Sequence, residues 1–496
     1  MEHKPTNEQV KIFDCTIKRP ENLLIKARAG SGKTHTALEC TKLLPKDKSI
    51  IFLAFNKHIQ EELKTKLPEQ IKCYTTYGLG MSAIKRKYGD KIKFDEFKID
   101  KIIQKKSKLW NLGEEFKDSE KISDYLYSIK KLVNLCRLSL TLKPEYIPYV
   151  ADRHEINLKK SNDIKRVLKV LDEATKNRDS FDYTDMIFLP AIDNGIWMFQ
   201  YDYVYVDECQ DFNQCQIKIL EKIIKRDRVT KKVTGRFFFF GDDLQQIYGF
   251  NSSDENVIKW FNNYPNTITL PLTTSFRCSK NVINKAQEYV PDINAMESAP
   301  DGIVREGNVL TEAKSGDFVL CRTTAPLVKL FFEFLLKGDK AIIKGSDIGV
   351  HLIESVGNIK TIDRLISYWQ NELISYSSQL KNEGILNPLE HSGYIALDDK
   401  VTTLLFLAKI SDNIPDLKNK INYIFTDEIS GIVLSTIHKV KGLESDRVFI
   451  IRPDLLPMKN AHGWQLAQEN NLIYVAITRA KLELIYDNEW TDENKK

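Results

Sequence analysis

One glycine-rich stretch constrains this chain more than any other feature. Residues 25–34 read IKARAGSGKT and directly follow an apolar run at 23–25. Gly30 and Gly32 let the backbone bend so that successive N–H groups point at phosphate oxygens. Lys33 then reaches the outer phosphates and Thr34 offers its hydroxyl to Mg²⁺. A Gly-Lys-Thr triplet also occurs by chance in ordinary glycine-rich turns. Here, however, it lies between a strand and a helix expected at 34–44, and this position favours a phosphate-binding loop.

Composition and cysteine usage narrow the class of protein. The 496 residues are 42% hydrophobic and 28% charged, typical of a globular chain with about three or four domains' worth of structure. We find no signal-peptide pattern and no run of 18 apolar residues, so we expect a cytoplasmic protein without a membrane anchor. The eight cysteines form no C-x-x-C pair, which indicates reduced thiols and neither a zinc site nor a disulfide framework.

Charge is distributed unevenly along the chain. Residues 91–180 carry 21 basic against 15 acidic side chains, whereas residues 346–430 carry 7 against 12. A solvated surface explains either imbalance. If one of the two segments contacts a phosphate backbone, the basic one is the better candidate.

Short apolar runs and helical segments alternate along the sequence. Strands are expected at 22–26, 49–55, 203–206 and 236–240, and again at 317–320, 341–343, 431–435, 447–451 and 482–486. Two segments, 91–180 and 346–430, are largely helical in period and interrupt these series. The pattern predicts an α/β fold of two parallel-sheet units, each split by a helical insertion.

An acidic pair follows the expected strand at 203–206. A phosphate-binding loop needs such a pair: Asp207 to hold Mg²⁺ and Glu208 to orient or deprotonate the attacking water. Two adjacent carboxylates are common on surface turns, so the motif gains its meaning from Lys33 and Thr34.

A third polar cluster follows the aromatic strand at 236–240. Gln245 is a candidate to contact the γ-phosphate. Tyr248 and Phe250 are candidates for base stacking, worth ~1–3 kcal/mol per base. The alternative is that both rings pack in the core.

These motifs and several later ones resemble the superfamily 1 helicases of the UvrD, Rep and PcrA group, with the F-box-type and phage-encoded branch as the finer placement. The resemblance implies two RecA-like parallel-sheet domains, of which 1–90 with 181–272 binds ATP and 273–345 with 431–496 forms the second. The insertions would be 91–180 and 346–430. In order, the motifs are TNEQ at 6–9, the loop at 27–34, LAFNK at 53–57, TTYGL at 75–79, FDYTD at 181–185, DECQD at 207–211, GDDLQQIYGF at 241–250, SFRCS at 275–279, STIHKVKGLE at 435–444 and YVAITRA at 474–480.

The resemblance implies roles for residues around ATP and Mg²⁺. Gln9 would read the adenine edge, Phe276 would stack on the ring, and Glu444 would accept from the ribose hydroxyl. Arg277 and Arg479 would reach the γ-phosphate as arginine fingers, although each could instead form a surface ion pair. The nucleotide-binding candidates are Gln9, Ala29, Gly30, Ser31, Gly32, Lys33, Thr34, His35, Phe276 and Glu444, with Thr34 and Asp207 as metal ligands and Lys33, Glu208, Gln245, Arg277 and Arg479 as catalytic residues.

The resemblance also implies that single-stranded DNA crosses both units. The matching positions are Phe55, Asn56, Thr75, Tyr77, Tyr248, Phe250, Thr436 and His438. Closure of the two units on ATP and their opening after hydrolysis would move the strand.

Four positions depart from the family pattern. His35 replaces an arginine usual beside adenine, which puts base selectivity into question. Cys209 replaces a tyrosine, Thr76 replaces an aromatic residue, and Asn251 stands where a DNA-contacting arginine is common. These three put the strength of the DNA grip into question rather than ATP hydrolysis.

We therefore expect an ATP-dependent DNA helicase that moves 3′ to 5′ on single-stranded DNA and opens partial duplexes. The runner-up is a DNA-sensing ATPase that regulates a partner nuclease with little unwinding, as in phage defence. An acidic surface binds duplex DNA poorly, so a protein partner or a regulatory role is our hypothesis for the insertion 346–430. No membrane partner is expected, and the sequence leaves the oligomeric state open.

Overall fold

The computed structural model describes residues 4–116, 119–154, 156–158, 161–247, 255–357, 359–382, 385, 387–459 and 461–490. These residues form two compact units. The first contains the described residues up to 272 and the second those from 273 onward, except that 28–31 group with the second.

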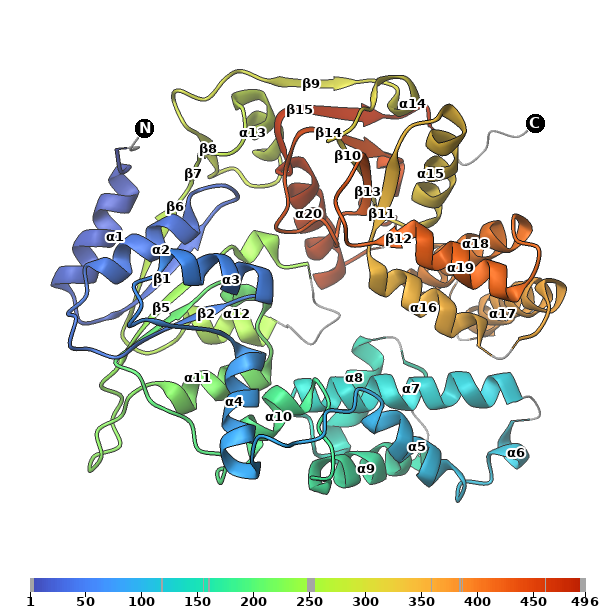
Figure 1. The fold of residues 1–496 in the computed structure, drawn as a ribbon, viewed down its shortest axis with the longest axis horizontal. Coiled ribbons are helices and arrows are strands. Elements are labelled where there is room, and N and C mark those ends of the chain that lie inside the picture. Colours follow the sequence, from blue (N-terminus) through green and yellow to red (C-terminus); the bar gives the residue numbers. More distant parts are fainter. Residues whose placement is uncertain are drawn as a thin grey trace. The chain divides into compact units, whose positions relative to one another are not determined.

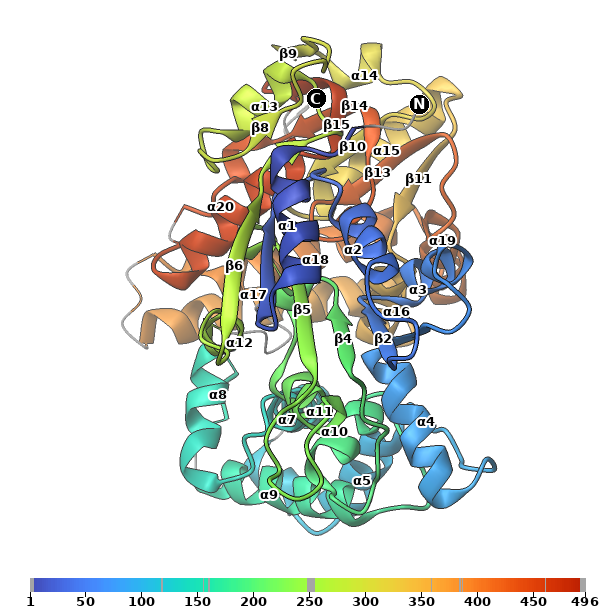
Figure 2. The same ribbon diagram turned by 90° about the vertical axis from the view of Figure 1, so that its left-hand side faces the viewer.

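A parallel sheet forms the centre of the first unit. Its six strands among the described residues run in the order β3-β2-β4-β5-β1-β6, and every pairing is parallel. The inner strands are buried almost throughout, as expected for strands covered on both faces. Figure 2 shows β4 and β5 running side by side. The strands are β1 (Asn22–Ala27), β2 (Ile50–Ala54), β3 (Lys72–Thr75), β4 (Tyr203–Val206), β5 (Arg236–Gly241) and β6 (Thr267–Leu272).

Helices cover this sheet and place polar residues at the carboxyl ends of its strands. Side-chain caps fix where several of them begin: Thr6 and Gln9 form a capping box on α1, and Asn213 and Gln216 form another on α11. The helices that pack around the sheet are α1 (Asn7–Lys18), α2 (Lys33–Lys42), α3 (Lys57–Lys66), α4 (Thr76–Tyr88), α10 (Asp185–Ile192), α11 (Gln214–Ile223) and α12 (Glu255–Asn262).

The insertion between α4 and α10 is a helical subdomain with its own hydrophobic core. Ile102, Leu132 and Val170 are among the side chains that meet there. Figure 1 shows these helices (cyan to green) gathered beside α10. They are α5 (Lys98–Ser107), α6 (Leu112–Glu115), α7 (Ser119–Leu138), α8 (Ile147–Arg153) and α9 (Ser161–Lys176).

The second unit contains another parallel sheet. Its seven strands among the described residues run in the order β12-β11-β13-β10-β14-β15-β9. These strands are β9 (Ile303–Glu306), β10 (Phe318–Cys321), β11 (Ala341–Lys344), β12 (Phe425–Thr426), β13 (Ile432–Thr436), β14 (Ser445–Ile451) and β15 (Ala480–Asp487). The helices around them are α13 (Lys280–Ala286), α14 (Val309–Glu312), α15 (Ala325–Lys337) and α20 (Trp464–Ile477), and a short pair joins β7 (Thr274–Ser275) to β8 (Asn294–Ala295).

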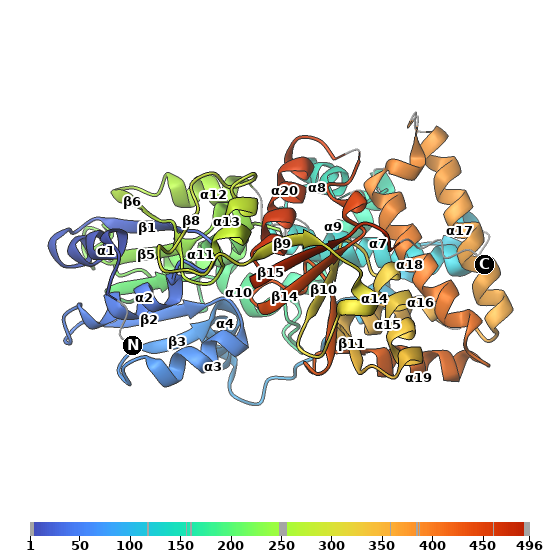
Figure 3. The same cartoon turned by 90° about the horizontal axis from the view of Figure 1, so that it is seen from above.

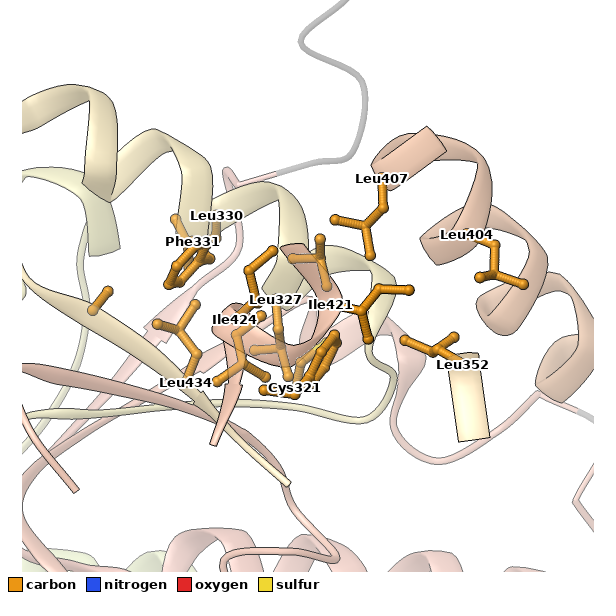
Figure 4. Packing of buried hydrophobic residues seen from close by; sticks show 14 of the residues in the cluster. Cys321, Leu327, Leu330, Phe331, Leu352, Leu404, Leu407, Ile421, Ile424 and Leu434 are labelled. Atoms are coloured by element: carbon orange, nitrogen blue, oxygen red, sulfur yellow. The ribbon is translucent and has the colours of Figure 1, made fainter. Parts of the chain in front are cut away.

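The insertion of the second unit shares one core with the sheet that it interrupts. Figure 3 shows its helices (orange) grouped together, and Figure 4 shows Leu404 and Leu407 near Ile421 and Leu327. The Asp399 carboxylate accepts from the backbone N–H groups of Thr324 and Ala325, both at 2.9 Å or less. This insertion is thus packed onto its unit. Its helices are α16 (Ser346–Val356), α17 (Ile362–Asn382), α18 (Ser392–Lys409) and α19 (Ile414–Ile424).

The expected fold class is confirmed: two parallel α/β units, each interrupted by a helical insertion. The sequence pattern did not predict β3, β6, β9 and the short strands β7, β8 and β12. In the described part of the chain, no helix combines the length and apolar character needed to cross a membrane.

Candidate functional site

The glycine-rich loop connects β1 to α2 in a conformation suited to an anion. Gly30 and Gly32 have φ angles of 71° and 75°, in the left-handed region that favours glycine. Gly32 is the N-cap of α2 and gives no side-chain cap, so the first N–H groups of the helix are left for another acceptor. The Ser31 hydroxyl is buried and has no hydrogen-bond partner among the described residues. Open helix N–H groups and an unpaired buried hydroxyl fit a phosphate group.

The acidic pair lies beside the lysine of this loop. Lys33 Nζ lies 3.4 Å from Asp207 Oδ1 and donates to Glu208 Oε1. Burial alone would lower the pKa of Lys33, but the carboxylates of Asp207 and Glu208 outweigh it and raise that pKa. Burial raises the pKa of Asp207. Thus the lysine, the metal-ligand candidate and the base candidate form one cluster, in which Asp207 is buried and Lys33 and Glu208 are half-buried.

Gln245 is connected to this cluster by Asp242, an aspartate that the sequence pattern did not single out. Gln245 Nε2 donates to Asp242 Oδ2 at 2.7 Å, and the Asp242 charge also acts on Lys33. Asp242 is fully buried and follows β5 just as Asp207 follows the neighbouring β4. That repeated position, a carboxylate at the end of a buried strand, was the available signal.

Gln9, the candidate for reading adenine, is buried against the helix that follows the loop. Its Nε2 donates to Thr36 Oγ1 at 3.0 Å, and its Oε1 accepts from Thr6 N at 3.0 Å. Both ends of the amide therefore have partners. His35, on the same helix, is exposed, and Thr34 is half-buried.

Two candidates of the second unit are in direct contact. Arg277 forms an ion pair with Glu444, so residues assigned separately to phosphate and ribose contact each other. Phe276, half-buried, precedes Arg277 in the chain.

Arg479 is almost fully buried, and its guanidinium donates to Val475 O at 2.9 Å and Leu443 O at 3.0 Å. Burial and the nearby charge of Arg277 lower the pKa of Arg479 to about 10, so it remains a cation at neutral pH. Backbone carbonyls hold this charge in place.

Two DNA-binding candidates are helix caps at the ends of adjacent strands. Asn56 accepts from Ile59 N at 2.9 Å at the start of α3, and Thr75 accepts from Gly78 N at 3.0 Å at the start of α4. Parallel pairing of β2 with β3 brings Phe55, Asn56 and Thr75 together at the carboxyl ends of these two strands. Tyr77 instead packs partly against the core, and burial raises its pKa to about 12.

The other DNA-binding candidates divide between the second unit and a stretch that the structure does not describe. Thr436 ends β13 and is 8% exposed, and His438 lies two residues further on. Burial, with the charges of Arg322, Lys439 and Lys441, lowers the pKa of His438 to about 3. His438 is therefore neutral at physiological pH and would offer a hydrogen bond rather than a charge. Tyr248 and Phe250 lie outside the described residues.

The cysteines and other potential metal ligands form no separate site in the described part of the chain. All eight cysteines are free thiols. No group of three or more His, Cys, Asp or Glu side chains capable of holding a metal was found among the described residues. The metal-ligand candidates Thr34 and Asp207 carry oxygen atoms, the ligand type that Mg²⁺ prefers.

Comparison with known proteins identifies relatives of both units. Residues 6–266 match the UvrD/REP helicase N-terminal domain and residues 340–487 the UvrD-like helicase C-terminal domain. The F-box DNA helicase protein 1 of Schizosaccharomyces pombe is 26% identical over 97% of this chain and 57% of its own length. The chicken (Gallus gallus) F-box DNA helicase 1 is 23% identical over 97% of this chain and 48% of its own length.

A bacterial relative is covered more fully. The ATP-dependent DNA helicase PcrA of Staphylococcus epidermidis is 22% identical over 94% of this chain and 80% of its own length. The chain spans only about half the length of the two F-box relatives.

Proposed function

The chain belongs to the UvrD-like helicase family, and on that premise we propose that it is an ATP-dependent DNA helicase acting in the cytoplasm. The observation that carries this proposal is the cluster of Lys33, Asp207 and Glu208 beside the glycine-rich loop. Cation, metal ligand and base are the parts that phosphoryl transfer needs.

In this proposal the first unit binds ATP and Mg²⁺. Residues 29–34 would hold the phosphates, and Thr34 and Asp207 would hold the ion, which when bound would neutralise the charge that develops on the phosphate oxygens. Gln9 and His35 lie next to the adenine ring, and Phe276 stacks on that ring. Glu444 accepts a hydrogen bond from the ribose hydroxyl. Since both ends of the Gln9 amide already have partners, reading adenine would require it to exchange one of them.

Glu208 is the proposed general base. Its carboxylate takes a proton from the attacking water, whose oxygen bonds to the terminal phosphorus while the bond to the ADP oxygen breaks. Gln245 contacts the same phosphate. Lys33 must leave Glu208 for the phosphate, which frees the carboxylate for this step.

The second unit supplies positive charge to the transition state. We assign this role to Arg277 and Arg479, and arginines in such positions are worth about 10³–10⁵ in rate. Because they are carried by the second unit, ATP binding and hydrolysis would change how strongly the two units attract each other. The proposed division is 1–90 with 181–272 and 273–345 with 431–496 as the two RecA-like domains, with 91–180 and 346–430 as their insertions.

We propose that single-stranded DNA binds the candidates named above, including Tyr248 and Phe250, and that movement is 3′ to 5′. Asn56 and Thr75 support a DNA-contacting region, because the Asn56 amide N–H groups and the Thr75 hydroxyl can donate to phosphate oxygens. The polarity rests on the family resemblance.

The experiment combines ATP hydrolysis with strand displacement. We expect ATPase activity stimulated by single-stranded DNA and unwinding of partial duplexes with 3′ tails. Unwinding only from 5′ tails would contradict the polarity. Glu208→Ala should abolish stimulated hydrolysis while ATP binding is kept, and near-normal turnover in that variant would refute the general-base assignment.

A second candidate is a DNA-sensing ATPase that regulates a partner nuclease. The acidic insertion 346–430, with 7 basic against 12 acidic side chains, favours a protein over DNA as its partner. ATPase activity with negligible unwinding, together with a stable complex containing a neighbouring gene product, would select this candidate over the helicase.

A further inference from the structure

Gln210 uses both ends of its side-chain amide to connect the proposed base to the next strand. Its Nε2 donates to Glu208 Oε2, and its Oε1 accepts from Asp242 N at 3.1 Å. Only 2% of Gln210 is exposed, so water does not compete freely for these bonds. The amide orientation follows from its partners, because a carboxylate needs the NH₂ end and a backbone N–H needs the oxygen end.

The Glu208 carboxylate is consequently held from two sides. Lys33 contacts Oε1 and Gln210 contacts Oε2. Glu208 also has a φ angle of 50°, in the left-handed region. The chain therefore turns at Glu208 instead of continuing the preceding strand, and this turn sets the direction of the side chain. In the proposed reaction Lys33 moves to the phosphate, whereas Gln210 can keep its bond to Glu208 throughout.

The end of β5 fixes the position of Gln210 itself. A Cβ atom at Gly241 would lie 2.6 Å from Gln210 Oε1 and 2.6 Å from Cys209 Sγ, so the side chain of Gln210 occupies the space that only glycine leaves. Gln246 Nε2 donates to the backbone oxygen of Gln210 at 3.2 Å. The amide is therefore anchored on rigid backbone on one side and presents its NH₂ group on the other.

We propose that Gln210 is a positioning residue for Glu208: it sets the carboxylate orientation in which Oε2 is hydrogen-bonded by Gln210 and Oε1 takes the proton once Lys33 has left. This inference rests on the proposed role of Glu208 as the base. A base held in one orientation keeps its accepting lone pair aligned with the water, and small misalignments are costly in rate. Gln210 is not among the residues assigned to the nucleotide, so we expect its loss to change turnover and to leave nucleotide affinity intact.

Two substitutions separate positioning from structural support. Gln210→Leu removes both hydrogen bonds. Gln210→Glu keeps an acceptor for Asp242 N–H but has no N–H to give to Glu208 when ionised. We expect both variants to lower kcat by about 10- to 100-fold, the range for groups that orient a catalytic side chain, with KM for ATP within twofold of the wild type. Normal kcat in Gln210→Glu would show that Gln210 only supports the backbone, and would overturn the proposal.

Gln287→Leu is the matched control. Gln287 is half-buried and donates through Nε2 to a backbone oxygen, Ile293 O, at 2.7 Å, but it lies in the second unit and is assigned no role in hydrolysis. The chemical change is the same, so a loss of kcat in this variant equal to that in Gln210→Leu would overturn the proposal by showing a general effect of losing an amide hydrogen bond.

A double-mutant comparison distinguishes failure of this inference from failure of the proposed function. In a Glu208→Gln background, where the base is absent, Gln210→Leu should reduce the residual kcat by less than twofold. A further 10-fold loss there would overturn the positioning role. If Glu208→Gln itself turns over normally, the general-base assignment fails first; if only Gln210→Leu and Gln210→Glu turn over normally, this inference fails alone.

Discussion

The guanidinium of Arg137 and the carboxylate of Asp182 form a two-point ion pair in the interior of the first unit, with NH1–Oδ2 and NH2–Oδ1 distances of 2.8 and 2.9 Å. Arg137 lies on α7 of the insertion, whereas Asp182 directly follows the insertion. A second carboxylate, Asp185, bonds Arg137 at 2.6 Å and Lys98 at 2.7 Å. Two cations from the insertion thus meet two anions at its junction with the sheet.

Arg137→Leu should destabilise the protein by about 3–5 kcal/mol, because it leaves buried carboxylates without their main cation. Urea unfolding measures this change. The matched control is Lys176→Leu, which breaks the ion pair with Asp172, whose side chains are 75% and 61% exposed. That pair should contribute under about 1 kcal/mol. Equal losses in the two variants would show that the buried network contributes no more than a surface pair.

Acidification should destabilise the first unit through His154. Burial, assisted by Lys131 and Arg153, lowers the pKa of His154 to about 4. In the unfolded chain a histidine titrates near 6.5, so between these values the unfolded state takes up a proton that the folded state refuses. The contribution of His154 to the free energy of unfolding is therefore fully present above about pH 6.5. It falls on acidification, by at most about 1.4 kcal/mol per pH unit.

His154→Gln should make stability less steep between about pH 6.5 and pH 4, measured by urea unfolding at several pH values. Replacement of His58, an exposed residue on α3, with glutamine is the control. An unchanged slope in His154→Gln would mean that the buried histidine does not cause the acid sensitivity.

Glu444→Gln should separate the two contacts assigned to this carboxylate. If Glu444 accepts from the ribose 2′-hydroxyl, the variant should raise KM for ATP roughly tenfold, as expected for a hydrogen bond to a charged group, and leave KM for 2′-deoxy-ATP nearly unchanged. If Glu444 serves only to hold Arg277, with which it forms an ion pair, kcat should fall for both nucleotides alike. Steady-state kinetics with the two nucleotides gives the answer.

Removal of Mg²⁺ should stop ATP hydrolysis, and added Mg²⁺ should restore it. Asp207→Asn should require a higher Mg²⁺ concentration for half-maximal turnover, because it removes one anionic ligand from the proposed ion site. Asp202→Asn is the control. Asp202 lies at the opposite end of the same strand, where its carboxylate pairs with Lys225 at 2.6 Å. An equal Mg²⁺ requirement in Asp207→Asn and the wild type would refute the metal assignment.

Sequence patterns located the buried strands better than the edge strands. The run at 203–206 is all apolar or aromatic and forms β4 over those residues. In contrast, β6 lies at the edge of its sheet and contains Pro271, and β3, at the other edge, begins with the exposed Lys72. Edge strands tolerate proline and polar residues because one side of their backbone is unpaired. They therefore lack the apolar signal by which strands were recognised.

The sequence by itself determined the kind of chemistry: a glycine loop ahead of a helix, an acidic pair after a strand, and the ordered motifs place phosphate-binding and carboxylate groups at strand ends. Such signals are local, since a few neighbouring residues specify a turn or a cap. Which side chains meet was decided only by the tertiary structure. Parallel pairing of β4 with β5, Val206 beside Phe239, brings Gln210 to Asp242, 32 positions along the chain. Packing within the second unit joins Arg277 to Glu444. These contacts depend on the order and register of strands distant in sequence, which local patterns do not encode.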